Sequence, residues 1–142
     1  MYVSLFSWDK QYLLEHKNFD EIGDRGEVWF GEAAMNRMIR WLEKNVPQSS
    51  KIIDLGCGNG VMSIELYEVG FKNVLGVDYS SHAIELAQKI ALENDIPDLK
   101  FEVSFSYFFH FFIYLHKLCI SGIAYFHIYL SKEVHYIMKA LF

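Results

Sequence analysis

Residues 51–60 read KIIDLGCGNG, and the prediction of the fold starts from them. The first half of this stretch is short and rich in β-branched residues, which favours a strand, and its second half carries three glycines at alternate positions. Apolar residues at helical spacing follow over residues 61–69, and Gly70 comes just after them as a helix stop. The stretch therefore predicts a strand, a tight glycine turn and a helix.

The same pattern repeats further along the chain. Residues 73–77 are strand-like, Ser80 or Ser81 can cap a second helix that ends before Pro97, and residues 99–103 supply a third strand. Right-handed crossovers would make these elements one half of a doubly wound parallel sheet. The expected fold is α/β and Rossmann-like, an incomplete sheet of about three strands.

The residues before this unit predict two helices. Apolar side chains recur at three- and four-residue steps from Glu32 to Asn45, and Pro47 ends that helix. A short helix is expected over residues 10–16, followed by an irregular loop up to Gly31. We therefore divide the chain into an N-terminal helix and lid loop (1–31), the half-sheet (32–103) and a tail (104–142).

The tail differs in composition from the rest of the chain. It holds 12 of the 24 aromatic residues, and within it residues 105–130 have no clear period of 2 or 3.6 and give no element that we predict. Residues 105–130 are long enough to cross a membrane, but Lys117 and three histidines interrupt them, so we favour an aggregation-prone segment over a membrane span.

Composition narrows the class of protein. The 142 residues suffice for one compact unit, and a net charge of −5 offers no basic surface to nucleic acid. Cys57 and Cys119 lie far apart and lack metal-ligand neighbours, so we predict neither a disulfide framework nor a metal site. No secretory signal is evident near Met1. We expect a cytoplasmic protein.

The glycine turn and two acidic residues indicate a nucleoside cofactor. The dinucleotide fingerprint G-x-G-x-x-G fails, because its third glycine would fall at Val61. Asp54, just before the turn, suits a cationic ligand, and S-adenosylmethionine carries a sulfonium and an ammonium but no phosphate. Asp78, 22 residues after Gly56, can accept the ribose hydroxyls, and Tyr79 would lie beside the adenine. Glycine turns also occur without ligands, so the prediction depends on this combination.

From residue 8 to residue 103 the chain resembles the class I, seven-stranded methyltransferases. Within that class it is similar to the lysine methyltransferases of translation elongation factor 1-alpha. The glycine motif is typical of the whole class, whereas the run from Gly26 to Glu32 is similar to the subgroup. The resemblance rests on Trp8-Asp9, the run Gly23–Glu32, Met35-Asn36-Arg37, Ile39-Arg40-Trp41, Asp54–Gly60 and Gly76–Ser80.

This resemblance implies S-adenosylmethionine-dependent methylation of a lysine on elongation factor 1-alpha, a protein substrate, by a monomer. It also implies that Trp29 and Phe30 lie over the cofactor pocket. Cys57 needs no chemical role, because a cysteine in such a turn is more often a small filler than a nucleophile. The candidate cofactor-binding residues are Trp29, Asp54, Gly56, Cys57, Gly58, Gly60, Asp78 and Tyr79.

The chain departs from the family after Val103. The resemblance implies an acidic residue there that recognises the adenine amino group, but the chain has Ser104-Phe105-Ser106. The later motifs are not found, so we assign no catalytic residue and expect a truncated or alternatively spliced form. Residues 51–55 would then be an open sheet edge unless the tail covers it. A non-catalytic fragment with part of the cofactor pocket, or a protein anchored in a membrane by its tail, are the alternatives.

Overall fold

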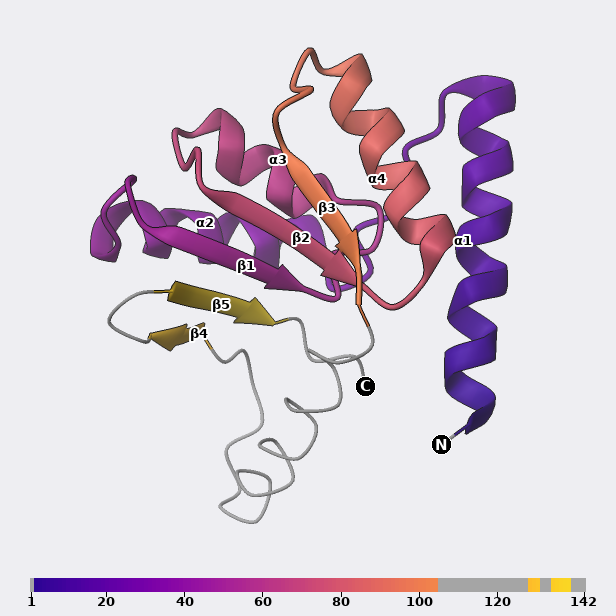
Figure 1. Ribbon diagram of the computed structural model, residues 1–142, viewed down its shortest axis with the longest axis horizontal. Coiled ribbons are helices and arrows are strands. Elements are labelled where there is room, and N and C mark those ends of the chain that lie inside the picture. The colour runs from indigo at the N-terminus through magenta and orange to yellow at the C-terminus, as the bar shows by residue number, and fades with distance from the viewer. Residues whose placement is uncertain (1, 105–127, 131–133, 139–142) are drawn as a thin grey trace.

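A computed structural model describes the backbone of residues 2–104, 128–130 and 134–138, and the side chains of residues 8–104. Its centre is a five-stranded sheet in the order β3-β2-β1-β5-β4 (Figure 1). The strands are β1 (Lys51–Leu55), β2 (Val74–Asp78), β3 (Lys100–Val103), β4 (Ile128–Leu130) and β5 (Val134–Met138).

The sheet is mostly parallel. β2 pairs with β1 and with β3, β5 pairs with β1 on its other side, and all three pairings are parallel. β4 is antiparallel to β5 at the edge. The chain thus builds outward from β1 to β3 and then returns to the far side of β1. Ligands of doubly wound sheets bind beyond the carboxyl ends of the strands at such a reversal.

The predicted elements of the half-sheet are confirmed within one or two residues. Beside the three strands, they are α2 (Glu32–Asn45), α3 (Val61–Glu68) and α4 (Ser81–Glu93). Ser80 caps α4, because its hydroxyl oxygen accepts the Ala83 N–H at 3.3 Å. Figure 1 shows α2 and α3 behind the strands, with α4 beside α3.

Two predictions about element boundaries were wrong. The short helix expected over residues 10–16 is α1 (Tyr2–Ile22), which packs along α4 and ends where Gly23 adopts a positive φ of 70°. Residues 105–130, for which no element was predicted, include β4, and β5 follows them and fills the edge of β1. Both elements depend on contacts distant in sequence, which local patterns do not contain.

Most of the segment proposed as aggregation-prone or membrane-spanning, residues 105–127, lies outside the described residues. Within the part that the structure describes, no helix is both long enough and apolar enough to cross a membrane.

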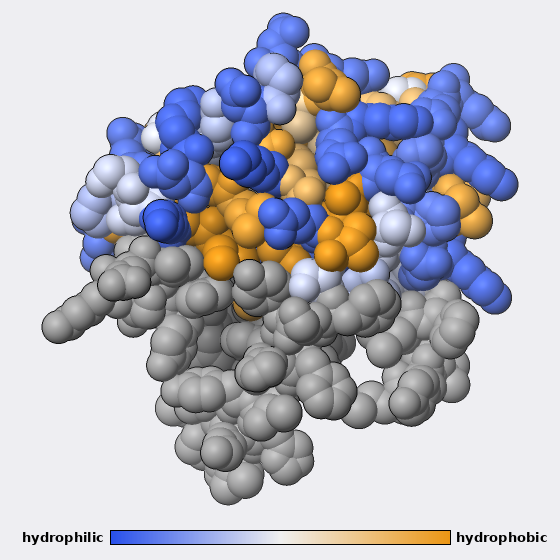
Figure 2. Space-filling view, in the orientation of Figure 1, coloured by the Kyte–Doolittle hydropathy of each residue, from blue (hydrophilic) through white to orange (hydrophobic). Residues whose placement is uncertain are grey.

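The described core lies between the sheet and its helices. Its fully buried side chains come from both layers, and include Leu42, Ile52, Leu66, Phe71, Leu86 and Ile90. On the other face of the sheet, the half-buried Ile53 and Leu75 are directly paired neighbours on β1 and β2. Figure 2 shows hydrophobic side chains gathered at the centre of the face turned to the viewer, with hydrophilic ones around them.

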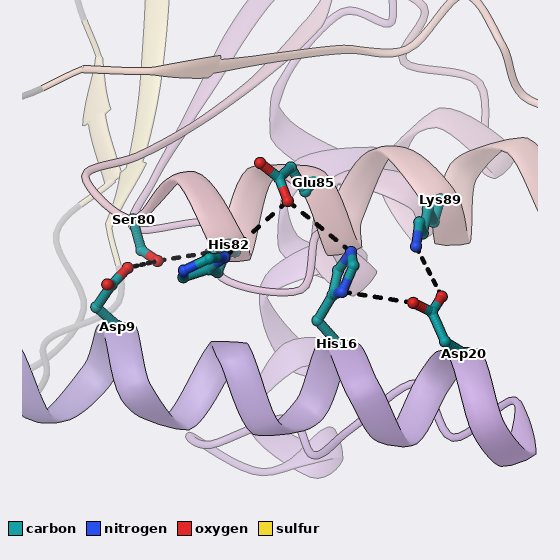
Figure 3. Close-up of polar contacts among 8 residues, drawn as sticks. Asp9, His16, Asp20, Ser80, His82, Glu85 and Lys89 are labelled. Atoms are coloured by element: carbon teal, nitrogen blue, oxygen red, sulfur yellow. Dashed lines mark hydrogen bonds and ion pairs between the residues drawn. The ribbon is translucent and has the colours of Figure 1, made fainter.

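Polar side chains join α1 to α4 along their length (Figure 3). The Ser80 hydroxyl donates to Asp9 Oδ1 at 2.6 Å, and the Lys89 ammonium donates to Asp20 Oδ1 at 2.7 Å. Between them, His16 lies 3.6 Å from an Asp20 carboxylate oxygen and 4.0 Å from one of Glu85.

Two histidines, His16 and His82, belong to this helix pair. The His16 side chain is only 17% exposed, because α1 and α4 enclose it. His82 is 31% exposed and lies 4.0 Å from the same Glu85 carboxylate.

Candidate functional site

The glycine turn after β1 forms the floor of a pocket. The N–H groups of Gly56 and Cys57 both donate to the carbonyl of Val77, at 2.8 and 3.1 Å, which fastens the turn to β2. Gly56 and Gly58 have positive φ angles of 74° and 56°, a conformation that side chains rarely permit. The exposed backbone of this turn can therefore approach a ligand closely.

Asp78, at the carboxyl end of β2, is fixed against this floor. Its Oδ2 accepts the Gly58 N–H at 3.0 Å and its Oδ1 accepts the Ser80 N–H at 3.0 Å. The residue is only 3% exposed, yet it lines the pocket. Because each carboxylate oxygen can accept more than one hydrogen bond, Asp78 can hold ligand hydroxyls while it keeps these backbone contacts.

The loop over residues 23–31 forms a lid, and Asn59 ties it to the floor. The Asn59 side-chain amide donates to the carbonyls of Arg25 and Glu27, at 3.0 and 3.3 Å. Trp29 on this loop is 45% exposed and meets Trp8 of α1 edge to face, with the ring centroids 4.6 Å apart. The lid, α1 and the glycine turn thus meet around one space.

That space is a pocket that opens to solvent. It is lined by Trp8, Tyr12, Glu27, Val28, Trp29, Phe30, Gly56, Cys57, Gly58, Asn59, Val61, Met62, Asp78 and Tyr79.

Carboxylates and burial keep the phenols of the pocket neutral. Burial, and next the charge of Asp78, raise the pKa of the Tyr12 hydroxyl far above its usual value. The same two causes raise the pKa of Tyr79, with a further contribution from Asp9. Both hydroxyls therefore remain hydrogen-bond donors at physiological pH.

Six of the eight predicted cofactor residues line this pocket, which brings them together as expected. They are Trp29, Gly56, Cys57, Gly58, Asp78 and Tyr79. Their contact with a cofactor stays a prediction.

Asp54 and Gly60 do not line the pocket. Asp54 is fully buried on the helix side of β1, where its Oδ2 accepts the Ser63 hydroxyl at 2.8 Å. A Cβ at Gly60 would lie 2.7 Å from Ala87 and 2.8 Å from Phe101, so helix–sheet packing explains that glycine. Asp54 supports the turn from below, and the predicted contacts of Asp54 and Gly60 with a cofactor stay predictions.

Sequence reasoning missed the contribution of α1 and the role of Asn59. Tyr12 lies one helical turn after Trp8, a spacing that places both side chains on one helix face. That spacing was a usable signal once a longer helix was considered.

The pocket fits an adenosylmethionine-type ligand. Gly56 and Gly58 line it with their backbone, and Asp78 presents a carboxylate beside them. Its lining is largely apolar and aromatic, which suits an uncharged adenosine. The fold and the site together define a class I methyltransferase.

Comparison with known proteins agrees with this class. A methyltransferase domain family matches residues 48–105. The chain is 44% identical to human EEF1A lysine methyltransferase 2 over 97 residues, which are 68% of this chain and 41% of that protein. It is 39% identical to the protein-lysine N-methyltransferase efm4 of Schizosaccharomyces pombe over 111 residues, 67% of this chain and 47% of that protein. The chain belongs to the class I methyltransferases, whose cofactor is S-adenosylmethionine, and it spans less than half of the length of these relatives.

Among solved structures, the chain is similar to magnesium protoporphyrin IX methyltransferase from Synechocystis, which was crystallised with bound S-adenosylmethionine. The TM-score is 0.48 at 24% identity, over 66% of this chain and 53% of that one.

Proposed function

We propose that this chain carries the cofactor-binding half of a protein-lysine methyltransferase that acts on elongation factor 1-alpha. The observation that carries the proposal is Asp78, held by two backbone N–H groups at the end of β2 and lining the pocket beside the glycine turn. The relatives named above, both protein-lysine methyltransferases and one named for elongation factor 1A, support the substrate.

Each of the pocket residues would contact a different part of the cofactor. Asp78 would hold the ribose, the backbone of Gly56 and Gly58 would lie against the nucleoside, and Tyr79 would border the adenine. Trp29 and its neighbours on the lid would exclude water. When bound, S-adenosylmethionine supplies the electrophilic methyl group. A substrate lysine, with an ordinary pKa of about 10.4, must lose its proton before it can react. No residue is assigned to that task.

Isothermal titration of the full chain with S-adenosylmethionine tests the proposal. We expect saturable binding that Asp78→Ala weakens roughly 50-fold or more, since two hydrogen bonds to a charged acceptor are lost. Asp98→Ala removes an exposed carboxylate outside the pocket and should bind as the parent does. Circular dichroism checks that each variant is folded. Folded protein that takes up no cofactor would overturn the proposal.

A methylation assay on elongation factor 1-alpha then separates the enzyme from a second candidate, a non-catalytic form that retains the cofactor pocket. The family match ends at residue 105, and this observation favours the second candidate. Cofactor binding without methyl transfer would identify it. We further propose that the protein is a monomeric, truncated form located in the cytoplasm, which gel filtration, transcript sequencing and fractionation would test.

A further inference from the structure

Helix α1 contributes Trp8 and the phenol of Tyr12 to a pocket whose other lining residues come from the lid, the segments at the carboxyl ends of β1 and β2, and the start of α3. Tyr12 is buried, and its ring lies against the glycine turn: a Cβ added at Gly58 would meet the Tyr12 hydroxyl oxygen and would lie 3.2 Å from the ring carbon that bears it. Gly58 is also the residue whose N–H donates to Asp78. The phenol therefore reaches the point at which the Asp78 carboxylate is fastened.

The hydroxyl of Tyr12 is available to a ligand. Tyr12 lines the pocket, and among the residues that the structure describes its hydroxyl has no hydrogen-bond partner. Burial and the nearby Asp78 charge hold its pKa high, so the group is a neutral phenol that can donate a proton. A donor thus stands next to a carboxylate acceptor on the same wall.

Neighbouring contacts fix Tyr12 relative to Asp78. Three residues earlier on α1, Asp9 accepts the Ser80 hydroxyl at 2.6 Å, and the Ser80 N–H donates to Asp78 (Figure 3 shows the Asp9–Ser80 contact). Four residues earlier, Trp8 packs against Trp29 of the lid. Within the turn that precedes Tyr12, the helix is therefore tied through Ser80 to Asp78 and through Trp8 to the lid.

We propose that Tyr12 is a cofactor-positioning residue that donates a hydrogen bond to the oxygen of a ribose hydroxyl of S-adenosylmethionine. The inference rests on the proposed function. A ribose hydroxyl that donates its proton to Asp78 keeps lone pairs on its oxygen, and a neutral phenol beside the carboxylate is the complementary donor. Tyr12 would thus extend ribose recognition from the strand ends to helix α1.

The test is titration of the full chain with S-adenosylhomocysteine, which binds without transferring a methyl group. We expect Tyr12→Phe to weaken binding about 5- to 20-fold, the loss typical of one hydrogen bond. Tyr67→Phe is the matched control, because Tyr67 is a half-buried tyrosine of α3 outside the pocket. The affinity of this variant for S-adenosylhomocysteine should stay within about twofold of that of the parent. Thermal unfolding of both variants reports on folding.

The 2′-deoxy and 3′-deoxy analogues of the same ligand locate the contact. If Tyr12 binds a ribose hydroxyl, the penalty of Tyr12→Phe disappears with the analogue that lacks that hydroxyl and persists with the other. A penalty that persists with both analogues would overturn the inference, and so would equal binding by the parent and Tyr12→Phe. In both cases the proposed function survives, because the parent binds. A folded parent that binds no ligand overturns the proposed function and this inference together.

Discussion

Gly58 is constrained by its backbone conformation and by its surroundings. Its φ of 56° disfavours any side chain, and a Cβ would also meet the Tyr12 hydroxyl. Gly23 has a similar φ of 70°, but a Cβ there would meet no atom within 4 Å. Alanine substitutions at Gly23 and at Gly58 therefore distinguish the cost of backbone strain alone from the cost of strain combined with a steric clash.

We predict that Gly23→Ala costs about 1 kcal/mol of unfolding free energy and that Gly58→Ala costs about 2–4 kcal/mol. Urea denaturation measures both. Combining Gly58→Ala with Tyr12→Phe should recover part of the larger loss, because the hydroxyl that meets the new methyl group is gone. Equal losses of unfolding free energy for Gly23→Ala and Gly58→Ala would contradict the prediction, because they would mean that the Tyr12 side chain moves aside at no measurable cost.

Glu15 makes the stability of the protein depend on pH. Its side chain is buried behind the lid, and burial is the main cause that raises its pKa above its usual value of 4.5. Neighbouring Asp24 and Glu27 raise it further. The folded state therefore holds the proton more tightly than the unfolded state, and the protein loses stability as pH rises above 4.5 through the folded pKa.

We predict that Glu15→Gln reduces this loss between pH 4.5 and pH 7 and raises the melting temperature at pH 7. Thermal unfolding across that range tests it, with Glu93→Gln, an exposed glutamate at the end of α4, as the control. Parallel pH profiles for the parent and Glu15→Gln would contradict the prediction.

At the scale of elements, α1 and α4 are joined by contacts of unequal strength. Ser80 is 1% exposed and both caps α4 and donates to Asp9. The Lys89 and Asp20 side chains are 42% and 50% exposed, so solvent screens their ion pair. We therefore expect the buried contact at the start of α4 to determine how firmly α1 is held.

Ser80→Ala should cost about 1–3 kcal/mol, because it removes a helix cap and leaves Asp9 without its donor. Lys89→Ala should cost less than about 1 kcal/mol. Chemical denaturation gives both values. A larger loss for Lys89→Ala than for Ser80→Ala would mean that the exposed pair, and not the cap, fastens the helix.

The half-sheet could be predicted from the sequence because the patterns that indicate its elements are local. The glycine turn, the Ser80 cap and the apolar periods each lie within one element or its neighbour, so β1 to β3 and α2 to α4 could be predicted. The same order along the chain placed Gly58 and Asp78 at adjacent strand ends. By contrast, α1 depends on packing against α4 and β5 on pairing with β1, and neither partner is near in sequence.

The site was partly predictable for a related reason. A motif fixes which residues occupy a turn, but the direction of a side chain depends on the face of the strand that carries it. Asp54 points to the helix side and meets Ser63, so it supports the turn instead of lining the pocket. Tyr12 could not be placed without the course of α1.

For the whole molecule, β5 decides whether β1 is an interior strand. The register runs from Lys51 opposite Val134 to Leu55 opposite Met138, which covers the full length of β1. A parallel strand left open on one side exposes unpaired N–H and C=O groups.

We predict that a chain ending at residue 127 loses exchange protection in β1 by about tenfold or more, whereas a chain ending at residue 138 keeps it. Hydrogen exchange with mass spectrometry compares the two with the parent. The shorter chain should also be the more prone to aggregate. Equal protection in all three would mean that β5 adds nothing to β1.

The order of the strands also bears on how the protein acquires its shape. β1, β2 and β3 are successive along the chain and are joined by single helices, whereas β5 reaches β1 only after a gap of about eighty residues. Contacts of short sequence separation form at a lower entropic cost. The floor of the pocket, from the glycine turn to Asp78, belongs entirely to the early, low-contact-order part. During synthesis, this floor can therefore assemble while the strand that completes the sheet is still inside the ribosome.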